Sequence, residues 1–294
     1  PRRRSSPITG DSARTVPAGR LRPLRPAEER AGRGARGEVV PPVAVEAHGL
    51  RKTFGDKHAV DGIDLAIPRG TFYGIAGPNG AGKSTTLRML TGLLRPDAGT
   101  ATLDGVPVWP DPLRAKARVG FVPDNPVLFD RLTAPEMLEY AGMLRGMAPD
   151  VVAERSVELL RVLDLAYEGD KLIADFSLGM VKRIGLAVAL LHSPRVLVLD
   201  EPFGALDPVN TQVMEDVLRL YRHGGGTVVF ASHVMDVVQR LCDRVVVIGA
   251  GRVLTEGTVA EVACDRNLQD AFVELVGGRD LGEGELSWLS SYSG

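Results

Sequence analysis

The chain has 294 residues, of which 44% are hydrophobic and 24% are charged, and its formal net charge is −2. These values are typical of a globular protein with enough residues for one large domain or two small ones. No uninterrupted apolar run approaches the roughly 20 residues that span a bilayer, so we assign any membrane role to a partner. Two cysteines are too few for a disulfide framework or a zinc site, and they are consistent with a reducing cytosol.

Residues 1–42 differ in composition from the rest of the chain. They contain ten Arg, no Lys and four acidic residues, which gives a net charge of 10 − 4 = +6, together with seven Pro and scarcely any aliphatic residues. A segment of this composition cannot build a hydrophobic core. We therefore predict a disordered tail, either simply solvated or acting as a basic arm that contacts anionic lipid or a partner. Residues 277–294 are assigned to a C-terminal tail.

Short strands begin after this segment. Residues 43–47 and the alternating Ile63, Leu65 and Ile67 predict strands on either side of residues 50–55. Residues 100–103 predict another strand that leads into a tight turn at Asp104-Gly105. We expect these strands to be antiparallel and to precede and flank a parallel sheet.

A glycine-rich loop follows a strand predicted for residues 71–76. Its sequence matches G-x-x-x-x-G-K-[ST], and Leu87, Leu90 and Leu94 then recur at helical spacing, so a helix is expected to begin at the loop. In such a loop the backbone N–H groups point at phosphate oxygens, the lysine adds positive charge near the β and γ phosphates, and the serine hydroxyl can bind Mg²⁺. We assign nucleotide binding to Gly77, Pro78, Asn79, Gly80, Ala81, Gly82, Lys83, Ser84 and Thr85.

Residues 124–180 are expected to form helices. Thr133-Ala-Pro-Glu136 is a capping box that opens a helix to about Leu144, and Asp150 is a candidate cap for a second helix. We expect a small helical insertion between the phosphate loop and the next motif.

The acidic pair Asp200 and Glu201 follows an apolar strand at residues 195–199. Such a strand ends at the edge of a parallel sheet where α/β folds bind ligands. Adjacent side chains point to opposite faces while they are still on the strand, so the two carboxylates can have different roles. Asp200 would hold Mg²⁺, and Glu201 would polarise the attacking water. Helices and strands alternate after this pair and end in an edge hairpin at residues 245–254, which predicts a doubly wound α/β domain.

The motifs occur in the order that defines the ATP-binding subunits, or nucleotide-binding domains, of ABC transporters. The chain resembles this family over about residues 43–276, with Phe176-Ser-Leu-Gly-Met-Val-Lys-Arg183 between the phosphate loop and the acidic pair. The resemblance implies a P-loop NTPase of the α/β class. We expect a mostly parallel sheet with helices on both faces, an N-terminal antiparallel β portion, and an inserted helical subdomain at about residues 124–180.

The resemblance also implies roles for residues outside the phosphate loop. Phe54 would stack on adenine, and His233 would make a catalytic contact with the γ-phosphate. Ser177 and Gly179 match the signature motif that contacts the nucleotide bound by the other subunit. Asp207 matches a loop that communicates across the dimer.

The chain departs from the pattern of the family in two places, the signature motif and residue 124. The usual signature Leu-Ser-Gly-Gly-Gln is Phe176-Ser-Leu-Gly-Met180 here, which resembles a variant found in drug and antibiotic exporters. Asp124 stands where the family usually has Gln. It keeps an oxygen for Mg²⁺, so we group it with Ser84 and Asp200 as a metal ligand, but it adds negative charge and lacks the amide donor. The adjacent Asn125 is a candidate to supply that amide.

The sequence therefore predicts an ATP-hydrolysing subunit of a membrane transporter, an exporter by resemblance, whose transmembrane permease is a separate chain. It would act at the inner face of the cell membrane as a head-to-tail homodimer or heterodimer around two ATP–Mg²⁺, with no nucleic acid among its partners. The alternative is a soluble ABC-type ATPase switch without a membrane partner, as in cluster assembly. Four histidines match no motif and are interpreted as surface or loop residues: His48, His58, His192 and His223.

Overall fold

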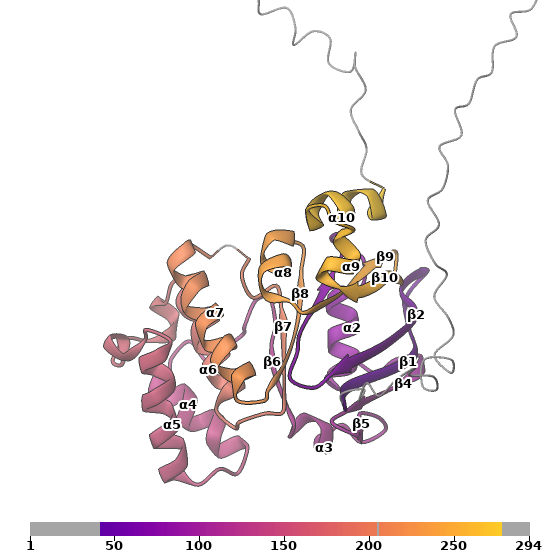
Figure 1. The fold of residues 1–294 in the computed structure, drawn as a ribbon. Coiled ribbons are helices and arrows are strands. Elements are labelled where there is room, and N and C mark those ends of the chain that lie inside the picture. The colour runs from indigo at the N-terminus through magenta and orange to yellow at the C-terminus, as the bar shows by residue number, and fades with distance from the viewer. Residues whose placement is uncertain (1–41, 205, 278–294) are drawn as a thin grey trace, which may run out of the picture. The chain divides into compact units, whose positions relative to one another are not determined.

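The computed structural model describes residues 42–204 and 206–277, so the tails predicted for 1–42 and 277–294 lie outside the described residues except for their innermost positions. A six-stranded sheet has the order β10-β9-β3-β8-β7-β6. Its five strands from β9 to β6 run parallel, and β10 pairs antiparallel with β9 at one edge, which confirms the edge hairpin (Figure 1). The strands are β3 Phe72–Ala76, β6 Val119–Val122, β7 Val196–Asp200, β8 Thr227–Ser232, β9 Arg244–Gly249 and β10 Arg252–Thr258.

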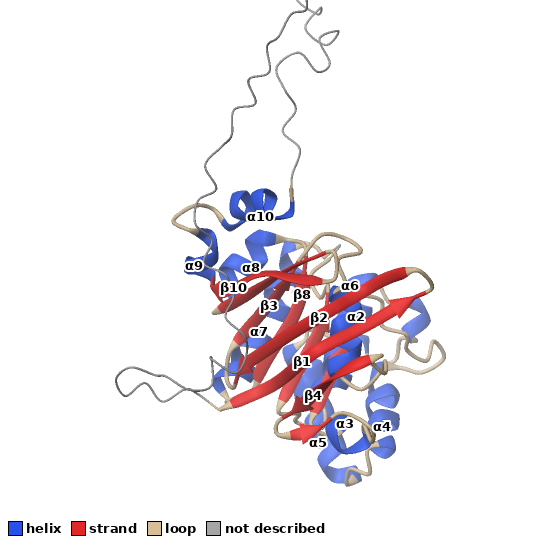
Figure 2. Cartoon of the chain, turned by 90° about the vertical axis from the view of Figure 1, so that its right-hand side faces the viewer, coloured by secondary structure: helices blue, strands red, loops and turns tan. Residues whose placement is uncertain are grey.

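A second, antiparallel sheet of order β2-β1-β4-β5 confirms the predicted N-terminal β portion. Its strands are β1 Val43–Phe54, β2 Lys57–Pro68, β4 Ala98–Leu103 and β5 Val106–Pro107. β1 is longer than predicted because its pairing register shifts between Ala47 and Leu50, around Gly49 with φ +56°. Such a bulge breaks the two-residue alternation on which the prediction relied. Figure 2 shows β1, β2 and β4 as a separate layer in front of the parallel sheet.

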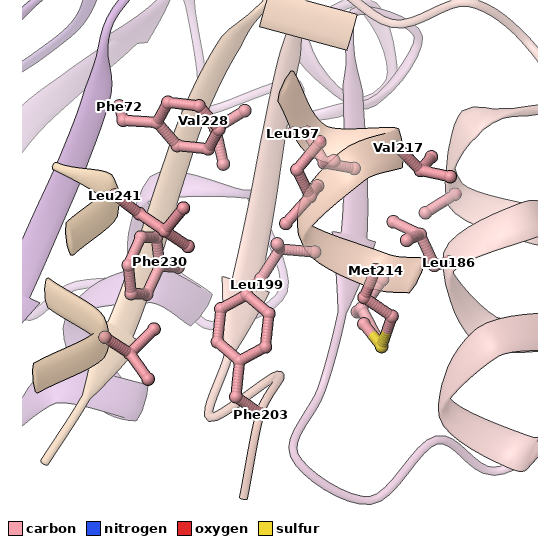
Figure 3. Close-up of a cluster of buried hydrophobic side chains, with 14 of the residues drawn as sticks. Phe72, Leu186, Leu197, Leu199, Phe203, Met214, Val217, Val228, Phe230 and Leu241 are labelled. Atoms are coloured by element: carbon pink, nitrogen blue, oxygen red, sulfur yellow. The ribbon is translucent and has the colours of Figure 1, made fainter. Parts of the chain in front are cut away.

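Helices pack on both faces of the parallel sheet because its strands are apolar on both sides. Leu199 and Phe230 face a core shared with α6, α7 and α8 (Figure 3), whereas Val198 and Val229 face a core shared with α2 and the antiparallel sheet. α2 contacts strands of both sheets and therefore lies between them. The helices are α2 Lys83–Leu90, α3 Leu113–Lys116, α4 Ala134–Leu144, α5 Pro149–Val162, α6 Leu178–Leu190, α7 Pro208–His223, α8 Met235–Leu241, α9 Val259–Ala263 and α10 Leu268–Val276, with short 3₁₀ turns at Ala166–Glu168 and Ile173–Asp175.

Two predicted helix ends differ from the structure. α2 ends at Leu90, where the hydroxyl of Thr91 donates to the carbonyl of Leu87, so Leu94 lies beyond the helix although it packs against the same core. Asp150 is not the cap of α5. The cap is Ala148, because Pro149 occupies the first helical position with its φ preset, and Asp150 lies in the first turn, where its charge suits the helix dipole.

The capping box at Thr133 is confirmed. The backbone N–H of Thr133 donates to Glu136 at 2.8 Å, and the Thr133 hydroxyl accepts from the N–H of Glu136 at 3.4 Å. The bond from the Thr133 N–H, and after it a bond of 3.0 Å that the Thr133 hydroxyl donates to Oε2, lower the pKa of the Glu136 carboxyl. The box begins α4 at the residue that the sequence indicates. The limits of a separate helical subdomain stay a prediction.

Within residues 42–204 and 206–277, no helix is both long and apolar enough to cross a membrane.

His192 lies in the turn after α6, as expected for a loop residue, but it is not at the surface. The other three unassigned histidines are exposed, but His192 is half-buried, with Nε2 3.2 Å from the carbonyl oxygen of Val119 and Nδ1 buried without a hydrogen-bond partner. Burial, and then the positive charge of Arg145, lower the pKa of His192 to about 4 from its ordinary 6.5. Since protonation would place a charge among apolar groups, the folded state holds this ring neutral.

The low pKa of His192 predicts a loss of stability in mild acid. Because the folded pKa lies below the unfolded one, the contribution of the neutral ring is complete above pH 6.5 and is lost as pH falls toward 4. At pH 5 we expect a loss of about 1 kcal/mol, discounted for the partial exposure of the ring, or about 2–4 °C in Tm. His192→Asn should remove this part of the pH dependence. Thermal unfolding at pH 7 and pH 5 tests it, and equal losses in parent and variant would contradict it.

Candidate nucleotide site

The phosphate loop joins β3 to α2, and its two fixed glycines are required by the backbone. Gly82 has φ +106°, and a Cβ there would lie 2.4 Å from the carbonyl oxygen of Ala59. A Cβ on Gly77 would lie 2.5 Å from the carbonyl oxygen of Ile248. α2 begins at Lys83 with no side-chain cap and no acidic residue in its first turn. Its N-terminal N–H groups and the positive end of its dipole therefore suit an anion.

The Lys83 ammonium is held inside the loop. It is 6% exposed, donates to the carbonyl oxygen of Gly77 at 2.7 Å and to that of Pro78 at 3.3 Å, and lies 3.5 Å from Oε1 of Glu201. A buried ammonium needs such partners to offset its desolvation. The same contacts hold the positive charge of Lys83 close to the position that a phosphate bound to the loop would occupy.

Asp200 ends β7 and is 1% exposed, and the Ser84 hydroxyl donates to its Oδ1 at 3.0 Å. Burial raises the pKa of Asp200, the Ser84 bond opposes the rise, and the charge of Glu201 adds to it. Two hard oxygens at this spacing fit Mg²⁺, which takes one or two protein ligands together with phosphate oxygens and water. No cluster of three or more His, Cys, Asp or Glu that could hold a metal occurs in the part of the chain that the structure describes.

Glu201 lies just beyond β7 in the left-handed region, with φ +47°. The expected strand alternation therefore does not apply to it, and both carboxylates of the pair approach the phosphate loop. Its side chain is 14% exposed, with Oε1 3.5 Å from Lys83 Nζ and Oε2 2.9 Å from Nδ1 of His233. The structure thus brings together a lysine, a carboxylate and an imidazole from three separate segments.

A pocket of about 340 Å³ opens above the phosphate loop. Phe54, which is 51% exposed, lines the pocket, and so does the half-exposed Asp124. The amide of Asn125 donates to Asp124 itself, at 3.2 Å. The lining residues are Phe54, Lys57, Ala59, Asn79, Gly80, Ala81, Gly82, Lys83, Ser84, Thr85, Asp124 and Glu201.

Lys57 is a lining residue that the sequence interpretation missed. It pairs with Phe54 across the turn between β1 and β2, and directly opposed residues of an antiparallel pair share a face. The sequence did contain a signal for Lys57: an aromatic residue and a lysine stand on either side of a two-residue turn, which predicts that they share a face.

Three residues assigned from the resemblance do not line this pocket: Ser177, Gly179 and Asp207. They lie instead at the starts of α6 and α7. Ser177 caps α6 by accepting from the N–H of Met180 at 3.3 Å. Asp207 caps α7, accepting from Asn210 N and Val209 N, and these bonds lower its pKa, with the Asn210 N–H as the largest cause. The Asn210 side chain donates to Asp207 and lies against Gly179, so the two helix starts adjoin.

Comparison with known proteins identifies relatives of the chain. The family model for ABC transporters matches residues 60–204. The daunorubicin/doxorubicin resistance ATP-binding protein DrrA of Streptomyces peucetius is 40% identical over 76% of this chain and 67% of its own. The linearmycin resistance ATP-binding protein LnrL of Bacillus subtilis (strain 168) is 34% identical over 79% of this chain and 74% of its own.

A solved structure of the ATP-binding subunit of an ABC transporter superposes with a TM-score of 0.74 at 27% identity, covering 79% of this chain and 99% of the solved one. The relatives and the solved structure each match between three quarters and four fifths of the chain, and the residues that the family model matches, 60–204, contain the phosphate loop and the acidic pair. The chain belongs to the ABC transporter family, as an ATP-binding subunit with ATPase activity.

Proposed function

We propose that the chain powers an exporter whose transmembrane permease is a separate polypeptide, and that it works at the inner face of the cell membrane. The observation that carries the ATPase part is the Glu201 carboxylate, which faces both Lys83 and His233 at the phosphate-loop pocket. Export is supported by the relatives: besides the two resistance proteins, the Nod factor export ATP-binding protein I of Burkholderia lata is 39% identical over 77% of this chain.

In this proposal the residues of the pocket have distinct roles. Phe54 would stack on adenine, and the loop N–H groups and Lys83 would bind the phosphates. Ser84 and Asp200 would hold Mg²⁺, which supplies positive charge against the phosphate oxygens. Glu201 would accept a proton from the attacking water, and His233 would orient the Glu201 carboxylate through the 2.9 Å contact.

The signature residues support a head-to-tail dimer. Ser177 and Gly179 open α6 away from the pocket that holds Lys83. If they contact a nucleotide, it is one bound to another subunit, and two chains then form two composite sites around two ATP–Mg²⁺. The partner subunit would be a second copy of this chain or a homologue.

This arrangement predicts the behaviour of Ser177→Arg on a Glu201→Gln background. ATP binding by the monomer should stay within about twofold, because Ser177 does not line its pocket. Dimer formation with ATP should be lost, because the larger cation would occupy the subunit contact. Gel filtration with and without ATP measures this, and Val157→Arg, at an exposed position of α5, is the matched control. Loss of ATP binding by the monomeric Ser177 variant would place Ser177 in the local site and refute the model.

Membrane association tests the exporter part of the proposal. If a neighbouring reading frame encodes a hydrophobic multi-helix protein, we expect the chain coexpressed with that protein to co-fractionate with membranes and to be released by detergent together with it. Expression without the partner should leave it in the supernatant. A supernatant location in both cases would favour the soluble ATPase switch.

A further inference from the structure

Lys182 is a buried lysine to which the proposed ATP site assigns no role. It lies on α6, five residues after Ser177, and is 2% exposed. Its ammonium donates to the backbone carbonyl of Glu201 at 2.8 Å and to that of Gly204 at 3.0 Å, and it lies 3.5 Å from Oδ1 of Asp124. The three N–H bonds of the ammonium thus have three acceptors from two other segments.

The charge of Lys182 requires an anion nearby. A buried ammonium is costly unless it is paired, and carbonyl dipoles alone do not neutralise it. The carboxylate found at its ammonium is Asp124, whose own side chain is 51% exposed. A glutamine at position 124 could offer an oxygen, but it could not balance the charge. Asp124 and Lys182 are therefore complementary in charge.

The pair connects the wall of the pocket to the carboxylate at Glu201. Asp124 lines the pocket, and Lys182 holds the carbonyl of Glu201, whose backbone has φ +47°. The Gly204 N–H donates to the same carbonyl at 3.3 Å, and the Phe203 ring packs edge-on against Phe230 of β8. Lys182 is the charged member of this support, and it acts on the backbone at the residue whose side chain faces Lys83 and His233.

We propose that Lys182 is a positioning residue that holds the backbone of Glu201 in its catalytic orientation, and that Asp124 serves this chain as the counter-charge of Lys182. The proposal rests on the proposed role of Glu201 in ATP hydrolysis. It gives Asp124 a function that differs from the metal ligand expected from the sequence. It also gives a reason for an aspartate at a position where the family usually has glutamine.

The sharpest test is Asp124→Gln, which introduces the residue usual in the family. In the full chain we expect kcat for ATP hydrolysis to fall about tenfold, because Lys182 loses its counter-charge and the Glu201 backbone shifts. The equilibrium Kd for ATP and the Mg²⁺ concentration for half-maximal rate should stay within about twofold. Asp124→Glu, which keeps the charge at a half-exposed site, should retain most of the activity. If Asp124→Gln matches the parent, or needs much more Mg²⁺, the proposal is wrong.

A double-mutant cycle separates this pairing from two independent effects. Lys182→Gln alone should lower kcat about tenfold with ATP affinity retained, and the double variant Asp124→Gln/Lys182→Gln should be no slower than the worse single variant. If the fold-losses in kcat of the two single variants multiply in the double variant, the proposal is wrong. Lys171→Gln is the matched control, since it breaks a lysine–carboxylate pair of similar length, 3.6 Å to Glu168, at a half-exposed site.

Thermal unfolding of the same four proteins gives a readout that does not need ATP turnover. Each single variant should lower Tm, and the double variant should lie closer to the parent than the sum of the two losses predicts, because both charges are gone together. Additive losses in Tm would refute the pairing even if a single variant were too unstable for kinetics. A parent chain that binds no ATP, with non-additive Tm values, would instead refute the proposed function and leave the ion pair established.

Discussion

Replacing Glu201 by Gln is expected to lower kcat for ATP hydrolysis by about 10²–10⁴, or roughly 3–5 kcal/mol of barrier. The amide keeps the size of the side chain and can still accept from His233, but it cannot take the proton of the attacking water. ATP affinity should stay within a few-fold, so the variant should accumulate as an ATP-bound dimer. Steady-state hydrolysis and equilibrium nucleotide binding measure the two effects separately.

Asp200→Asn is the informative comparison for Glu201→Gln. Asp200 is buried and accepts from Ser84, so its loss should weaken the dependence on Mg²⁺ as well as the rate. A parent rate in Glu201→Gln would show that Glu201 is not the base. The water would then have to be oriented by another group at the pocket, such as Asp124 or His233.

Features that depend on residues close together in the chain could be predicted from the sequence. The capping box at Thr133 begins α4, and the acidic pair follows an apolar strand of the parallel sheet, as expected. Each of these features depends only on interactions among residues that are a few positions apart in the sequence. The order of the predicted strands and helices was likewise sufficient to predict an α/β fold with an antiparallel N-terminal sheet.

Features that depend on distant contacts or on a single backbone angle could not be predicted. The left-handed backbone of Glu201 turns its carboxylate toward Lys83, and no periodic pattern encodes that angle. Lys182 contacts Asp124, which is 58 residues away in the sequence, and Glu201, which is 19 residues away. These contacts form only when α6 packs against the sheet, so the sequence does not reveal them. His192 is half-buried for a similar reason: its partner Val119 lies 73 residues earlier.

Replacing Lys83 by Ala is expected to reduce ATP binding the most. Each charge-assisted phosphate bond contributes about 1.5–3 kcal/mol, and an ammonium that makes two of them supplies about 3–6 kcal/mol, or 10²–10⁴ in affinity. The shape of the loop should survive, because φ +106° at Gly82 and the close contact of Gly77 with Ile248 do not depend on the lysine. Titration with labelled ATP should therefore show no binding at micromolar nucleotide while the variant remains folded.

Two controls make the Lys83→Ala result specific. Lys57→Ala removes an exposed ammonium from the same pocket and should weaken binding only a few-fold, because a solvated charge contributes little. Thermal unfolding without nucleotide should show that Lys83→Ala is folded, and added ATP should raise the Tm of the parent but not that of the variant, since a ligand stabilises only the state that binds it. Near-parent affinity in Lys83→Ala would mean that the phosphates do not lie on this loop, and the assignment of the pocket would fail with it.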